Sequence, residues 1–233
     1  MKHAFIAVLA FLIISSLPVA GEDSADYWYS QAQQLLINGS FEEASSSYDK
    51  ALEIDRFNTT LLIGKGRALA NLGRFSEAID SFDLALELDS SNADAWYFKG
   101  LVLSNGLGKY DEGIAAFDKA LESRPSYADA WINRGMALGN AGRLDESISS
   151  FDKAIEINPR DPVVWNNKGV VLREKGNYKE AMSCFDQALE LNPSYEVAQE
   201  NKKRTRQVLN QDNFYELDDI LYKAKQREGS LME

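Results

Sequence analysis

The feature that most constrains this chain is an internal repeat with a period of about 34 residues. Residues 93–96 (ADAW) recur unchanged at 128–131, and residues 117–120 (FDKA) recur at 151–154. A period of this length is typical of small units that stack on one another, because one unit is too short to bury its own apolar faces. We place the repeats at 25–58, 59–92, 93–127, 128–161 and 162–195.

Each repeat is expected to contain two amphipathic helices joined by a tight turn. In the third repeat, Trp96, Leu103, Ile114, Phe117 and Leu121 follow helical spacings on either side of the turn. A glycine lies between the two apolar runs of every repeat, where a helix commonly ends in a left-handed residue. These glycines are Gly39, Gly73, Gly108, Gly142 and Gly176. The third repeat is one residue longer, because residues 105–108 extend its turn.

Large and small residues recur at fixed places in the repeats. A tryptophan or leucine in the first helix is followed four positions later by alanine or glycine, and the second helix carries an aromatic ring followed by alanine. We expect the rings to pack beside the small residues, within and between repeats. The small residues are Ala32, Gly66, Gly100, Gly135 and Gly169, and the rings are Tyr48, Phe82, Phe117, Phe151 and Phe185. The expected fold class is therefore all-α, an α-solenoid whose ends need capping.

The N-terminus has the pattern of a secretory signal peptide. Lys2 precedes an apolar run over residues 4–17, and small residues follow Pro18 before the polar stretch 22–24. We predict cleavage near Gly21, so residues 1–21 are expected to be removed and the protein exported to an extracellular, periplasmic or cell-surface location. The alternative is an uncleaved N-terminal membrane anchor, although the run is short for a spanning helix.

Composition excludes several classes of function. The chain has a net charge of −11, which argues against general affinity for nucleic acid. Its single histidine, His3, lies in the signal segment, and Cys184 is its single cysteine, so histidine triads, histidine-ligated zinc, internal disulfides and CxxC sites are all ruled out. We expect no cofactor, no metal and no catalysis.

The repeat pattern fades after Tyr195. Residues 196–210 are polar and are predicted to form a helix that caps the last repeat. Within 211–233, Phe214, Leu217 and Leu221 form an apolar stripe, which predicts an amphipathic helix followed by a tail. This final helix either folds onto the end of the solenoid or contacts a partner.

The order of bulky residue, small residue, glycine turn, aromatic ring, alanine and proline resembles the tetratricopeptide repeat family. The resemblance covers 25–195 and extends to exported prokaryotic, including archaeal, members. It implies a right-handed superhelix whose concave groove, lined by the first helices, binds an extended or helical peptide of a partner protein. The groove residues expected from this register are Tyr29, Gln33, Arg67, Asn71, Tyr97, Asn105, Asn133, Asn140, Asn166 and Asn167, with Ile63, Leu101, Ile132, Met136, Val170 and Arg173 beside them.

Some members of the family clamp a terminal carboxylate with lysine, asparagine and arginine at fixed positions. The matching positions here, in either of two registers, lack the required cations, so that clamp is not expected. These positions are Tyr29, Gln33, Gly64, Asp94 and Phe98, or Ile63, Arg67, Phe98, Asp129 and Asn133.

Two features have a plain structural interpretation. Carboxylate doublets such as Glu42-Glu43 and Asp145-Glu146 begin the second helices, where the helix dipole favours negative charge. Cys184 is expected to pack in the core. The sequence therefore predicts a non-catalytic scaffold for protein–protein interaction. The alternative is a structural component of the cell envelope that assembles with copies of itself through the C-terminal helix, the solenoid ends or Cys184.

Overall fold

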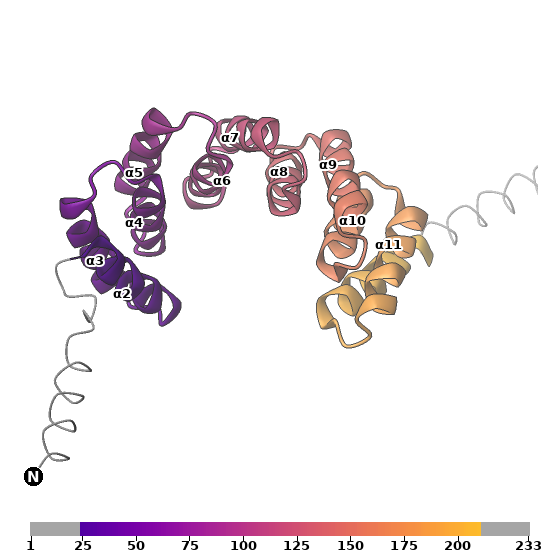
Figure 1. The fold of residues 1–233 in the computed structure, drawn as a ribbon. Coiled ribbons are helices and arrows are strands. Elements are labelled where there is room, and N and C mark those ends of the chain that lie inside the picture. Colours follow the sequence, from indigo (N-terminus) through magenta and orange to yellow (C-terminus); the bar gives the residue numbers. More distant parts are fainter. Residues whose placement is uncertain (1–23, 211–233) are drawn as a thin grey trace, which may run out of the picture. The chain divides into compact units, whose positions relative to one another are not determined.

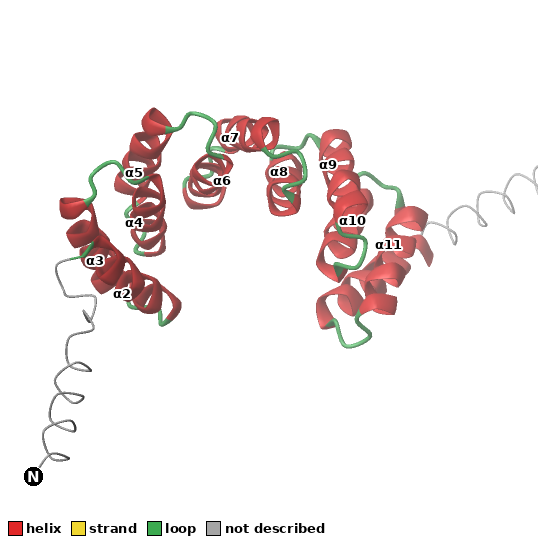
Figure 2. Ribbon diagram, viewed as in Figure 1, coloured by secondary structure: helices red, strands yellow, loops and turns green. Residues whose placement is uncertain are grey.

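The computed structural model describes residues 24–210, and every regular element in this range is a helix (Figure 2). The all-α class that the sequence predicts is thus confirmed for the described residues. The predicted signal peptide, and the amphipathic helix and tail predicted for 211–233, lie outside the described range.

The chain divides into two compact units, with the boundary between Val102 and Leu103. Consecutive helices pack against each other in each unit, and alternate helices also touch: α2 contacts α4, α4 contacts α6, and α8 contacts α10 (Figure 1). Unit 1 contains α2 (Ala25–Ile37), α3 (Phe41–Ile54), α4 (Thr59–Asn71), α5 (Phe75–Leu88) and α6 (Ala93–Leu101). Unit 2 contains α7 (Tyr110–Ser123), α8 (Ala128–Asn140), α9 (Leu144–Ile157), α10 (Pro162–Glu174), α11 (Tyr178–Leu191) and a helix over 196–210.

The extra residue of the third repeat is absorbed by a change in helix type. A π-helical turn, η1 (Val102–Gly106), directly follows α6, and the Lys109 amide then donates to the Leu103 carbonyl at 2.8 Å. A π turn holds one more residue than an α turn, so the insertion is accommodated within the helix end. The unit boundary falls inside this turn.

The predicted turn glycines all adopt the left-handed conformation, with φ between 66° and 88°. A Cβ built on any of the five would meet nothing within 4 Å, so the requirement for glycine comes from backbone conformation and not from crowding. The helix starts also follow the sequence: Pro162 occupies the first turn of α10, behind the N-cap Asp161, whose carboxylate accepts from the Val163 amide at 2.8 Å.

The predicted pairing of rings with small residues is present in both units. A Cβ added to Gly66 would lie 2.5 Å from the Phe82 ring, and one added to Gly169 would lie 2.6 Å from the Phe185 ring. Both rings are fully buried. Because a Cβ does not fit at such a distance, glycine lets the two helices of one repeat approach closely around the ring.

A ladder of ion pairs joins successive repeats, and nothing in the sequence analysis anticipated it. The aspartate that follows each core ring pairs with a lysine or arginine in the next first helix, sixteen positions on, at 2.5–2.7 Å in the first four cases. The side chains of the cations are 17–29% exposed, so the pairs are partly shielded from water. The pairs are Asp49–Lys65, Asp83–Lys99, Asp118–Arg134, Asp152–Lys168 and Asp186–Lys202.

The last pair of the ladder shows that helix 196–210 occupies the place of a further first helix. Trp131 and Trp165 donate through Nε1 to the carbonyls of Pro125 and Pro159, and Gln199 makes the equivalent bond to the Pro193 carbonyl at 2.8 Å. Exposed Lys203 stands where the preceding repeat has Gly169. A charged side chain therefore stands where the first helices have Ala32, Gly66, Gly100, Gly135 and Gly169.

Candidate functional site

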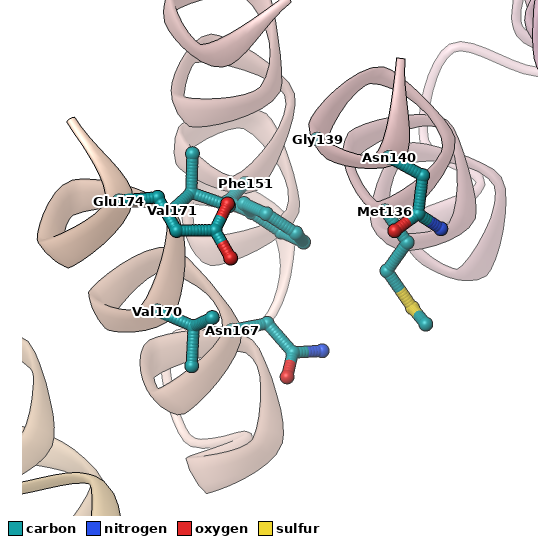
Figure 3. Close-up of a pocket in the computed structure, with 8 residues that line it drawn as sticks. All are labelled: Met136, Gly139, Asn140, Phe151, Asn167, Val170, Val171 and Glu174. Atoms are coloured by element: carbon teal, nitrogen blue, oxygen red, sulfur yellow. The ribbon is translucent and has the colours of Figure 1, made fainter. Parts of the chain in front are cut away.

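The first helices of unit 2 border a cavity of about 170 Å³. We call the side of each unit that is lined by first helices its inner surface. Figure 3 shows Met136 and Asn140 on α8 facing Asn167, Val170 and Glu174 on α10, with the Phe151 ring between them; Gly139 and Val171 complete the lining. Gly139 has no side chain to fill the space, which helps to keep it open.

The lining of this cavity combines apolar and polar groups. Phe151 is core, Val171 is buried and Val170 is half-buried, whereas the Met136 side chain is 40% exposed. Asn140 and Glu174 are exposed at the rim, so amide and carboxylate groups surround an apolar floor. Such a surface can bury an apolar side chain of a peptide while hydrogen-bonding its backbone.

Three other asparagines that the sequence placed in the groove have different surroundings. Asn166 is only 4% exposed, and its Oδ1 accepts from Asn201 of helix 196–210 at 2.9 Å. The amide of Asn133 donates to the Asp129 carbonyl one turn earlier at 2.8 Å. Asn105 is exposed on the π turn. Asn166 is therefore engaged in holding the terminal helix.

In unit 1, the inner surface is aromatic. Tyr29 on α2 lies 6.4 Å from Tyr48 between ring centroids, and on α6 the rings of Tyr97 and Phe98 meet edge to face at 5.1 Å. Gln33, the polar residue predicted on α2, is half-buried.

Arg67 and Asn71 occupy α4 in unit 1. The Arg67 guanidinium lies over the Phe98 ring, 4.8 Å from its centroid. The Asn71 amide donates to the Arg67 carbonyl at 2.8 Å, and its side chain is exposed. The five residues predicted for α2, α4 and α6 therefore belong to one unit and the other five to unit 2.

Cys184, which the sequence predicts to pack in the core, lies in a cluster of buried residues in unit 2. Cys184 is 6% exposed on α11, and burial raises the pKa of its thiol, which disfavours the reactive thiolate. No cluster of metal-ligating side chains occurs among residues 24–210, and none of the helices described there combines the length and apolarity needed to cross a membrane.

Comparison with known proteins identifies the repeat. Family models described as "Tetratricopeptide repeat" match residues 25–58, 63–104, 106–162 and 162–195. The chain belongs to the tetratricopeptide repeat family. The resemblance drawn from the repeats is thus confirmed, and no curated protein matches the chain.

Solved tetratricopeptide repeat structures are similar over most of the chain. YrrB, described as a TPR protein with an unusual peptide-binding site, is 30% identical, with 79% of this chain and 94% of YrrB covered and a TM-score of 0.63. MamA from Desulfovibrio magneticus RS-1 is 27% identical, with 74% and 97% covered and a TM-score of 0.66. TTC0263 from Thermus thermophilus shares the fold at 17% identity, with 78% and 98% covered and a TM-score of 0.62.

The tetratricopeptide repeat register explains which site residues the sequence analysis missed. Glu174 holds the position in α10 that Asn71 and Asn140 hold in α4 and α8, so alignment of the repeats could have found it. Gly139 carried no such signal, because its contribution is the room it leaves beside its neighbours.

Proposed function

We propose that this tetratricopeptide repeat protein is a non-catalytic scaffold that binds a peptide or helix of a partner protein on its inner surface. The single observation that carries the proposal is the cavity between α8 and α10, with its apolar floor and amide rim. The similarity to YrrB, a protein described as having a peptide-binding site, supports it.

Binding at this cavity needs no covalent step. An apolar side chain of the partner enters between Met136 and Val170, which removes apolar surface from water at about 25 cal/mol per Å². The side-chain amides of Asn140 and Asn167 then donate to and accept from the partner's backbone, since each amide carries both kinds of group. The site thus favours a segment with a regularly placed apolar residue over one that is charged throughout.

Peptide selection from a random displayed library tests the proposal. Selected peptides are measured against the full chain and against a Met136→Ala, Val170→Ala double variant, for which we expect affinity to fall about tenfold or more, as for the loss of a buried apolar anchor. Ile157→Ala is the matched control, because Ile157 is 39% exposed but lies at the end of a second helix. Equal affinity of the double variant and the wild type would reject the inner surface of unit 2 as the binding site.

We further propose that the protein is exported, on the basis of the pattern in residues 1–21. N-terminal sequencing of the protein from its native source tests this. A start near Glu22 would support cleavage, and a start at Met1 would support the anchored alternative.

A further inference from the structure

A second candidate site lies in unit 1, where the N–H groups of the Arg67 side chain have no hydrogen-bond acceptor among the described residues. Arg67 is half-buried on α4, and within residues 24–210 its guanidinium pairs with no carboxylate and donates no hydrogen bond. The half-buried cations nearest to it in the repeat scheme, Lys65 and Lys99, each have an aspartate partner. In a chain with 36 acidic and 25 basic residues, an arginine held in place without a carboxylate is unexpected.

The buried hydroxyl of Tyr48, near Arg67, also lacks a hydrogen-bond partner. The Tyr48 side chain is 0% exposed, and its Oη is the one buried side-chain polar atom in the described range that has no hydrogen-bond partner. This oxygen lies against Gly64, since a Cβ added there would be 2.6 Å away. Gly64 and Arg67 are three residues apart on α4 and so share a face of the helix. Burial raises the pKa of Tyr48 to about 12 while the nearby Arg67 charge opposes the shift, so the hydroxyl remains a neutral donor.

The surroundings of Arg67 suit a polypeptide ligand. The Phe98 ring supports the guanidinium from one side, which fixes its orientation and leaves its N–H groups available at the edge of the plane. Tyr97 contacts Phe98, and Tyr97 is half-buried on the same inner surface. A carboxylate held by the arginine would thus have an aromatic surface beside it for a neighbouring apolar side chain.

We propose that Arg67 is a recognition residue for an aspartate or glutamate side chain of a partner polypeptide, bound across α4 and α6 of unit 1. The carboxylate accepts hydrogen bonds from two N–H groups of the guanidinium, and the apolar residue next to it packs on Tyr97. The inference rests on the proposed scaffold function and adds the acidic character of the partner. We assign this carboxylate to an internal side chain of the partner and not to its C-terminus. A single guanidinium suits one carboxylate, and the several cations that a clamp for a terminal carboxylate uses are missing here.

Selection of displayed peptides tests the assignment, with the peptides joined to the coat protein at their C-terminus so that no free carboxyl end is present. The full chain, an Arg67→Gln variant and an Arg56→Gln control are each used as the target. Arg56 is exposed on the turn after α3, so its replacement removes the same charge away from α4. We expect peptides selected by the wild type and by Arg56→Gln to be enriched in aspartate and glutamate, and those selected by Arg67→Gln to lose this enrichment.

Affinity measurements complete the test. A selected acidic peptide should bind Arg67→Gln about tenfold or more weakly, and Arg67→Lys should retain part of the affinity, because lysine keeps the charge but not the paired donors. Circular dichroism melting confirms that the variants remain folded. If the peptides selected by the wild type and by Arg67→Gln contain the same fraction of aspartate and glutamate, the Arg67 assignment is overturned while the scaffold function stays in place. Selection of no peptide by any of the three proteins would overturn both.

Discussion

Units 1 and 2 build their inner surfaces from the same helix positions but with different chemistry. The position of Arg67 in α4 is taken by Met136 in α8 and Val170 in α10, and the position of Asn71 is taken by Glu174 in α10. In contrast, the residues that hold the helices together are repeated with little change. The comparison teaches that the ring and the small residue, which recur in every repeat, hold the helices together, while the remaining inner positions vary between the units and are the ones we propose to contact a partner.

The first repeat departs from the others in a way that sharpens this comparison. Its core ring is Tyr48 instead of phenylalanine, and the next repeat has Gly64 where later repeats have Phe98, Asn133 and Asn167. The phenol needs the space that Gly64 leaves, because ring atoms of Tyr48 would lie 2.4 Å from a Cβ there. Tyrosine and glycine at these two places therefore depend on each other.

The largest expected effect comes from removing a core ring in either unit. Phe82→Ala in unit 1 and Phe151→Ala in unit 2 should each lower the free energy of unfolding by about 3–5 kcal/mol, because both rings are buried and leave a cavity. Chemical denaturation measures the loss. Hydrogen exchange then shows whether protection falls mainly in the unit that carries the substitution; equal loss in both units would mean that they unfold as one.

Swapping phenylalanine and tyrosine at the core-ring position should distinguish the first repeat from the later ones. Phe98 holds the position in the third repeat that Gly64 holds in the second, so Phe82→Tyr lacks the room that Gly64 gives Tyr48 and should cost about 1–3 kcal/mol by overpacking. The reverse change, Tyr48→Phe, removes an unpartnered hydroxyl and should alter stability by less than about 1 kcal/mol near neutral pH. If both changes cost the same, Gly64 does not provide special room for Tyr48.

The alkaline pH dependence of stability provides a second measure of the same site. The pKa of Tyr48 is about 12 in the folded chain, above its ordinary value of 10.0, so its contribution to stability is complete below pH 10 and is lost as pH rises toward 12. The stability of the Tyr48→Phe variant should therefore decrease less steeply with pH in this range than the stability of the wild type. The melting temperature as a function of pH measures the difference, and identical slopes would contradict the burial of the phenol.

The ion-pair ladder should contribute modestly and similarly in both units. A double-mutant cycle with Asp152→Asn and Lys168→Gln should give a coupling of about 0.5–1 kcal/mol, since the lysine is shielded but the aspartate side chain is 48% exposed. The same cycle on Asp83 and Lys99 in unit 1 is the matched comparison. A coupling near zero in both units would mean that the ion pairs of the ladder do not stabilise the fold.

The smallest effect is expected at acidic pH. Hydrogen bonds from Arg74 and Arg143 lower the pKa of Glu77 and Glu146 at the starts of α5 and α9, one in each unit. A lowered folded pKa gives stability that is present above the ordinary value of 4.5 and disappears as pH falls through the folded value. Replacing each glutamate by glutamine should make thermal stability slightly less dependent on pH below this value, to a similar extent in both units.

The sequence was sufficient for the helices, the turns and the packing of rings beside small residues, because these features depend on local patterns that recur with the period. The π turn after α6 was visible only as one extra residue, since its geometry depends on how the helix end accommodates the insertion. The ladder could have been found by aligning the repeats, but charged pairs sixteen positions apart become neighbours only after the helices stack.

The site was predicted less completely than the fold. The repeat register predicted Asn140 and Asn167 for the groove, and both line the cavity. It did not predict the burial of Asn166, which depends on contact with helix 196–210. The significance of Arg67 also required the structure, because a missing ion pair is evident only once the partners of the neighbouring cations are known.

Hydrogen exchange of the full chain with and without a selected peptide tests the central claim most directly. Binding on the inner surface predicts slower exchange in the first helices, especially α8 and α10, with little change in the second helices α9 and α11. Slower exchange confined to the second helices would contradict the assignment of the inner surface as the binding face.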